Sequence, residues 1–141
     1  MPNSDSGKEN ASTPQPEIKK VPKVEDKPFE SFVNEDLIPG IKDSLLKNGV
    51  TPLQIKFQKG ERPVIGGSCW IVYGEMPNER QFWLCFDSDK ITSFKTISLA
   101  DAFSEPSLVE SFLIDEKKIT LPLLISRLLQ RLNGQKWLSA N

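Results

Sequence analysis

Cys69 and Cys85 carry the most reactive side chains in this 141-residue sequence. They fall in two predicted strands, residues 68–75 and 80–87, which a short turn joins. A hairpin centred on Pro77 would place the two cysteines directly opposite each other, where their thiols could form a disulfide. The same pattern suits two small buried hydrophobic side chains, the usual state of free cysteines on central strands. A thiol switch and a purely structural pair are therefore both open.

Histidine is absent from the sequence. This excludes histidine-based acid–base catalysis, Ser–His and Cys–His nucleophile pairs, and most zinc sites. Gly66 and Gly67 precede a predicted strand, so they match neither of the glycine-rich phosphate-binding fingerprints. Two cysteines are too few for a disulfide framework or an iron–sulfur cluster. The sequence therefore predicts no catalytic residues, no metal site and no cofactor, although an enzyme that relies on Asp, Lys or Tyr is a remaining alternative.

A group of basic residues in the last quarter of the chain is the second candidate site. Such charges usually cover a solvated helix surface, and the sharper alternative is a basic patch for an acidic partner. A tryptophan follows the last predicted helix and either folds back onto the core or serves as an exposed aromatic anchor. The predicted partner-binding residues are Lys117, Lys118, Arg127, Arg131, Lys136 and Trp137.

The overall charge and hydropathy limit the classes of function that the protein could have. A formal net charge of −1 provides no basic footprint for nucleic acid. No apolar run approaches the roughly 20 residues of a membrane-spanning helix. The N-terminus lacks the apolar stretch of a secretory signal, and its acidic residues argue against a transit peptide. We therefore expect a soluble chain that stays in the compartment where it is made, and two cysteines suit a reducing interior.

The N-terminal segment differs in composition from the rest of the chain. Residues 1–28 contain five prolines, balanced charges and only three branched aliphatic side chains. Such a segment cannot bury enough apolar area to offset the entropy of ordering it. We predict a disordered tail over residues 1–28 and a single folded domain over residues 29–141, which is long enough for one core.

The folded part begins with apolar residues at helical spacing, which predicts a helix with one buried stripe. Pro39 and Gly40 interrupt this pattern and predict a kink or two short helices, because proline removes a backbone donor. Asn48 and Gly49 form a helix stop. The stripe consists of Phe29, Phe32, Val33, Leu37, Ile41 and Leu45.

The hydrophobic period then changes from 3.6 to 2, which indicates strands. Residues 53–58 alternate between apolar and polar side chains, as in a strand with one wet face. Residues 68–75 and 80–87 are apolar on both faces, as in central strands. A fourth strand is predicted at 91–99. Four strands with short links indicate an antiparallel meander.

The C-terminal part returns to the helical period. Ser107 and Glu110 have the spacing of a capping box, which predicts a helix at the start of this region. Thr120 caps a second helix with Pro122 in its first turn, and Gly134 ends it. The predicted fold is α+β: a four-stranded antiparallel meander sheet packed by an N-terminal kinked helix and two C-terminal helices. The second helix has an apolar stripe of Leu121, Leu124, Ile125, Leu128, Leu129 and Leu132.

Three segments carry a family resemblance. They are KPFESFVNEDLIPGIKDSLLKNG, the Cys-Trp pair followed by the QFWLCFDSD strand, and PSLVESFLIDEKKITLPLLISRLLQRLNGQKWL. Together they resemble a family of small proteins of cyanobacteria and plastids, a domain of unknown function that we connect with subunit V of the photosynthetic NAD(P)H dehydrogenase-like complex. The resemblance covers residues 27–138.

The resemblance implies a non-catalytic peripheral subunit on the cytoplasmic side of the thylakoid membrane. Its partners would be other subunits of the complex and ferredoxin, and it would stabilise the arm that receives electrons in cyclic electron flow. Ferredoxins are acidic, so the resemblance implies contacts from the basic residues between 117 and 136. It supplies no catalytic residues.

A second likeness points to a different class of function. Strands followed by ISLAD, a helix and KKITLPLLISRLLQRL are similar in layout to sterol-carrier-type domains. Residues 117–120 would then form a short edge strand, and a lipid or other hydrophobic ligand would lie between the sheet and the C-terminal helix. A likeness in layout does not by itself specify a function. An assembly factor or another interaction module is a further alternative.

Overall fold

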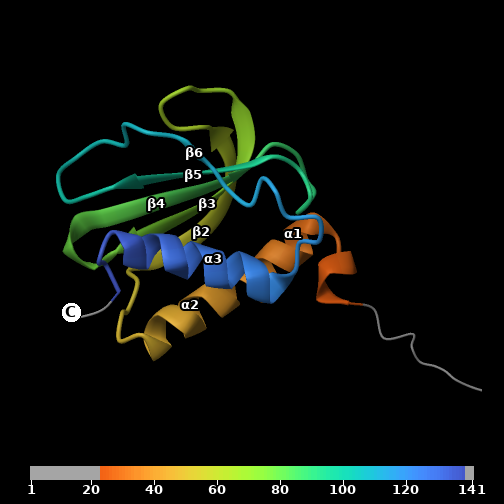
Figure 1. Ribbon diagram of the computed structural model, residues 1–141, viewed down its shortest axis with the longest axis horizontal. Coiled ribbons are helices and arrows are strands. Elements are labelled where there is room, and N and C mark those ends of the chain that lie inside the picture. The colour runs from red at the N-terminus through yellow and green to blue at the C-terminus, as the bar shows by residue number, and fades with distance from the viewer. Residues whose placement is uncertain (1–22, 139–141) are drawn as a thin grey trace, which may run out of the picture.

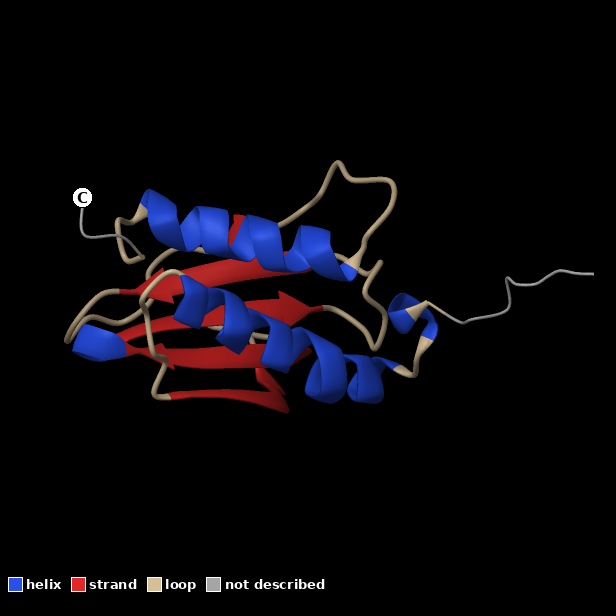
Figure 2. Ribbon diagram, turned by 90° about the horizontal axis from the view of Figure 1, so that it is seen from below, coloured by secondary structure: helices blue, strands red, loops and turns tan. Residues whose placement is uncertain are grey.

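The computed structural model describes residues 23–138, which form one antiparallel sheet with helices on one face (Figure 1; Figure 2). The strand order is β2-β3-β4-β5-β6, so the sheet is a meander. This confirms the predicted α+β class, with five strands rather than four. The main elements are α1 (Phe29–Phe32), α2 (Ile38–Lys47), β2 (Gln54–Glu61), β3 (Ser68–Met76), β4 (Arg80–Phe86), β5 (Lys95–Ala100), β6 (Glu110–Ser111) and α3 (Leu121–Gly134).

The predicted kink at Pro39 is replaced by a π-helical turn, Val33–Leu37, between α1 and α2. The Ile38 N–H donates to the Val33 carbonyl, five residues back. Pro39 consequently falls in the first turn of α2, where its missing N–H breaks no hydrogen bond. The chain therefore stays helical from Phe29 to Lys47 without a break.

The prediction of a helix near residues 107–114 is wrong. Glu110 and Ser111 form the short edge strand β6, which pairs with Ile97 and Thr96 of β5. The Glu110 carboxylate accepts hydrogen bonds from Arg131 of α3 instead of capping a local helix. One C-terminal helix, α3, therefore covers the sheet instead of two. Residues 117–120 are a connector and pair with no strand, so the short edge strand expected from the sterol-carrier-type layout does not form.

The domain begins earlier than predicted. Of the tail predicted over residues 1–28, residues 1–22 lie outside the described residues. Val24–Asp26 form a short 3₁₀ helix, and Val24 packs against the core. Residues 23–28 therefore belong to the folded unit: Glu25 bonds to the Leu121 N–H of α3, and Lys27 pairs with Glu35 and Asp36. The local composition does not reveal these contacts.

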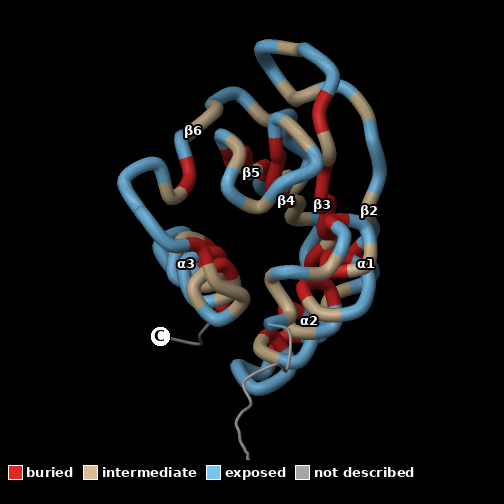
Figure 3. The backbone as a smooth tube through the Cα atoms, turned by 90° about the vertical axis from the view of Figure 1, so that its right-hand side faces the viewer, coloured by how far each residue is buried: buried red, intermediate tan, exposed pale blue. Residues whose placement is uncertain are grey.

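The core fills the space between the sheet and the helices. Figure 3 shows the buried residues on the strands and on the helix sides that face them. The central positions of the predicted α3 stripe, Leu124, Leu128 and Leu132, have no exposed surface. Phe29 contacts three other rings edge-on, with centroids 5.2–6.2 Å away. Within residues 23–138, none of the helices combines the length and the apolar composition that crossing a bilayer would need.

Candidate partner-binding surface

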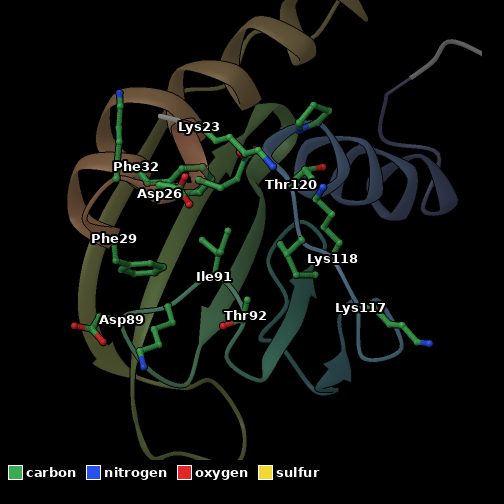
Figure 4. A pocket seen from close by; sticks show the side chains of 15 residues that line it. Lys23, Asp26, Phe29, Phe32, Asp89, Ile91, Thr92, Lys117, Lys118 and Thr120 are labelled. Carbon is green, nitrogen blue, oxygen red and sulfur yellow. The ribbon is translucent and has the colours of Figure 1, made fainter. Parts of the chain in front are cut away.

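An open cleft of about 700 Å³ lies at one end of the molecule. Three segments that are distant in sequence form its walls: residues 23–29, the loop 89–92 and the connector 117–120. Figure 4 shows Lys23 from the first segment and Lys117 and Lys118 from the connector around it, with Ile91 of the loop between them. The floor is apolar and includes Phe29, Phe32 and Ile119. We call this feature the lysine-rimmed cleft.

The N-terminal wall of the cleft is fixed to α3. The Glu25 side chain accepts a hydrogen bond of 2.7 Å from the Leu121 N–H in the first turn of α3. The Thr120 hydroxyl oxygen accepts from the Leu123 N–H at 3.3 Å, so two side chains satisfy free donors at this helix end. Residues 23–29 and the connector are thereby held in one arrangement.

The loop wall of the cleft is held by a buried lysine. The Lys95 side chain is almost fully buried, and its amine donates to the Ile91 and Ser93 carbonyls at 2.7 Å each. Burial lowers the pKa of this amine, because the charged form loses its hydration. The hydrogen bonds to these two carbonyls satisfy the buried Lys95 amine and close the turn that holds Ile91 at the cleft.

The lysines of the cleft differ in their electrostatic partners. Lys27 bonds to Asp36 at 2.8 Å and to Glu35 at 3.2 Å, and these hydrogen bonds raise the pKa of its amine. The acidic side chains of Glu25, Asp26 and Asp89 also line the cleft, so its lining residues carry five lysines against three carboxylates. Four of the lysines form no ion pair with another residue of 23–138: Lys23, Lys90, Lys117 and Lys118.

The two arginines predicted for partner binding are engaged within the domain. Arg131 donates two hydrogen bonds to the Glu110 carboxylate, at 2.8 and 2.6 Å, in a bidentate pair. Arg127 pairs with Glu116 at 3.3 Å. Their charges are largely balanced, so they contribute little to an attractive field for an acidic partner.

Lys136 and Trp137 lie at the other end of α3. The helix has 14 residues and is about 21 Å long, which separates them from the cleft. Trp137 is 6% exposed and folds back onto the core, with the Arg80 guanidinium 5.4 Å from its ring centroid. This is the first of its two predicted alternatives, and it removes Trp137 as an exposed anchor. The six predicted residues therefore form no single patch, and only Lys117 and Lys118 lie at the cleft.

The two cysteines are neighbours on the sheet face away from the helices, but not in the predicted register. Cys85 lies opposite Ile71, so Cys69 is its diagonal neighbour. The turn is centred on Asn78, whose φ of 63° lies in the left-handed region, rather than on Pro77. Diagonal pairs have Cα atoms about 7–8 Å apart, beyond the usual span of a disulfide. Burial raises the pKa of both thiols, that of Cys85 to about 12.

Both thiols are therefore expected to stay reduced in the folded protein after mild peroxide treatment. Buried, protonated thiols react slowly, because the thiolate is the nucleophile. Thiol counting with a chromogenic disulfide should give two thiols after unfolding and close to none while the protein is folded. Loss of both thiols after oxidation of the folded protein would restore the switch interpretation.

The comparison with known families adds one decisive observation. The family described as "Protein of unknown function (DUF2996)" matches residues 23–139, which is most of the chain. The chain belongs to the DUF2996 family. No curated protein matches its sequence. The match to the DUF2996 family includes all three walls of the lysine-rimmed cleft.

Sequence reasoning identified one wall of the cleft in this DUF2996 domain and missed the other two. Lys23 and Lys27 fall in the segment predicted to be disordered, and Lys90 in a turn. No local pattern connects these segments with residues 117–120; residues 23–29 are joined to them by the Glu25–Leu121 hydrogen bond across 96 positions.

The Arg131–Glu110 pair predicts a pH-dependent contribution to stability. Hydrogen bonds from Arg131 are the main cause that lowers the pKa of Glu110. The contribution is therefore present above the unfolded-state pKa and is lost as the pH falls through the lower folded-state pKa. Glu110→Gln should lower the free energy of unfolding by about 0.5 kcal/mol at pH 7, because the two side chains are partly exposed, 29% for Arg131 and 40% for Glu110, and solvent screens the pair. Urea denaturation at pH 7 and pH 3 should show a smaller difference in acid; an equal difference at both would contradict the assignment.

Proposed function

We propose that this DUF2996 protein is a non-catalytic accessory subunit of the photosynthetic NAD(P)H dehydrogenase-like complex. It would bind the arm that receives electrons from ferredoxin and stabilise that arm during cyclic electron flow. Its position would be peripheral, on the cytoplasmic side of the thylakoid membrane, held by contacts with other subunits. The sequence resemblance to the subunit V family supports this assignment to a complex.

The observation that carries the proposal is the lysine-rimmed cleft. Four lysines without a partner among residues 23–138 surround an apolar floor, and hydrogen bonds of Glu25 and Lys95 fix the walls. A pre-formed surface of this kind loses little conformational entropy on binding. Its positive charge suits an acidic partner such as ferredoxin or an acidic subunit surface, and would raise the association rate.

The alternative function, a sterol-carrier-like domain that binds a lipid or other hydrophobic ligand, has less support. A ligand between the sheet and α3 would need space there. Leu124, Leu128 and Leu132 of α3, together with Phe82 and Leu84 of β4, fill the centre of this layer and have no exposed surface. An open pocket of about 290 Å³ lies at its edge, between β6 and α3, where the Arg131–Glu110 ion pair borders it. No observation favours a lipid ligand, so the accessory-subunit proposal stands alone.

Affinity purification of the tagged full-length protein from thylakoids tests the proposal. The expected result is co-purification of dehydrogenase-complex subunits, identified by mass spectrometry, with recovery that falls between low and high salt because the contact is electrostatic. Recovery of the monomer alone at low salt, from membranes in which the complex is intact, would contradict it.

A further inference from the structure

The edge of β2 is a second surface that the lysine-rimmed cleft does not include. β2 is one of the two edge strands of the sheet, and it runs along the side of the molecule (Figure 3). It pairs with β3 without interruption, from Gln54 opposite Glu75 to Glu61 opposite Ser68. Eight residues in this conformation span about 26 Å. A long edge without a proline or a bulge is a template for another strand.

The register shows which backbone groups of β2 are free. The Arg62 N–H donates to the Gly67 carbonyl at 2.9 Å, and this pair continues the β2–β3 register. Hydrogen-bonded positions alternate along an antiparallel pair, so the even-numbered residues of β2 bond to β3. The N–H and C=O groups of Ile55, Phe57 and Lys59 therefore point away from the sheet.

The lysines of β2 leave this edge open. Lysine side chains commonly protect an exposed edge by standing along it. Here the Lys56 amine lies 5.7 Å from the centroid of the Tyr73 ring, and the Lys59 amine lies 5.2 Å from that of the Trp70 ring. Both side chains thus fold back across β3, on opposite faces of the sheet. Positive charge flanks the edge on both faces; Lys59 is exposed and Phe57 is half-buried, whereas Ile55 is 6% exposed.

We propose that the edge of β2 binds an extended acidic segment of a partner protein, which adds a sixth strand to the sheet. Backbone hydrogen bonds to Ile55, Phe57 and Lys59 would supply affinity. Acidic side chains on the two faces of the added strand would meet Lys56 and Lys59. This surface goes beyond the cleft, and its chemistry does not depend on which complex the protein joins.

Charge argues against a second copy of this chain as the occupant. Two β2 strands paired with each other would gather Lys56 and Lys59 from both copies, with only Glu61 from each copy to balance them. An acidic strand would neutralise the same charges. Like charges placed across a strand pair are destabilising.

A displayed library of random twelve-residue peptides, selected against the full-length protein, is the probe. The selected peptides should alternate apolar and polar residues and be rich in Asp and Glu. Lys59→Pro removes an outward N–H without touching the β2–β3 ladder, as is tolerated on edge strands. It should weaken peptide binding by about tenfold or more, whereas the matched control Lys59→Gln, which keeps the N–H, should weaken it by about threefold or less.

Hydrogen exchange locates the contact independently. Peptide binding should slow exchange at the amides of Ile55, Phe57 and Lys59 and leave the even-numbered amides of β2 unchanged. Unselective enrichment, equal binding to both Lys59 variants of confirmed fold, or protection elsewhere would overturn the proposal. A concentration-dependent dimer that Lys59→Pro abolishes would also overturn it, since the edge would then serve a second copy.

Discussion

Replacing both Lys117 and Lys118 by glutamate is expected to weaken binding to the dehydrogenase-like complex by about tenfold or more. Both lysines line the cleft, and neither forms an ion pair within residues 23–138. The double variant reverses the local field and should act mainly on the association rate. Folding should be unaffected, because exposed substitutions without a structural partner change stability by about 0.5 kcal/mol or less. Surface plasmon resonance on the purified complex would measure the loss.

A matched variant separates a local contact from the effect of net charge. Lys42→Glu with Lys136→Glu makes the same change in charge at exposed positions outside the cleft. It should retain nearly the full affinity. Raising the salt concentration should shrink the difference between the two double variants, because the Debye length is about 8 Å at physiological ionic strength. Equal losses in both would indicate that the cleft is not the docking surface.

Gly74→Val is expected to lower the free energy of unfolding by about 3 kcal/mol, the largest stability effect that we predict for a single substitution. Gly74 of β3 lies directly opposite Phe82 of β4. A Cβ at this position would lie 2.8 Å from Cδ2 of Phe82, and closer still to its Cε2 and Cζ. The Phe82 ring is fully buried, so it cannot move aside without disturbing the core. Chemical denaturation would measure the change.

Two further variants test this explanation. Gly60→Ala in β2 is the matched control, because a Cβ there would meet only Ile71 Cδ1, at 3.7 Å. It should change stability by about 0.5 kcal/mol or less. Phe82→Leu should partly rescue Gly74→Val, since the smaller side chain leaves room for the added methyl groups. Simple additivity of the two substitutions would show that the clash with Phe82 is not the cause.

The hydrophobic periods of the sequence are sufficient to predict the overall architecture. The alternation in residues 53–58 and the strands that are apolar on both faces predict the meander. Burial on one or both faces determines which positions of a strand are apolar, so the sequence shows it directly. The α3 stripe was predicted for the same reason, and its central leucines are in the core. These are local patterns, and they need no knowledge of distant contacts.

The errors arose where a distant contact decided a local conformation. Glu110 has capping-box spacing from Ser107, yet its carboxylate bonds to Arg131, 21 positions away. The hairpin register depended on the φ of Asn78, which places the turn centre one residue beyond Pro77. A one-residue shift of the centre moves each pairing by two positions, so Cys85 lies opposite Ile71 instead of Cys69.

The candidate site was the least predictable part, because three segments distant in sequence form it. Lys117 and Lys118 were predicted from their charge alone. Arg127 and Arg131 were grouped with them, although each pairs with a glutamate of the same domain. Only the tertiary arrangement distinguishes a lysine without a partner from an arginine that has one.

Ferredoxin-dependent electron transfer in thylakoids that lack this protein tests the central claim most directly. The proposal predicts that electron input through the dehydrogenase-like complex falls when the protein is absent. Adding back the wild-type protein should restore it, and adding back the Lys117→Glu, Lys118→Glu variant should not. Unchanged electron transfer in its absence, with the complex intact, would contradict the claim.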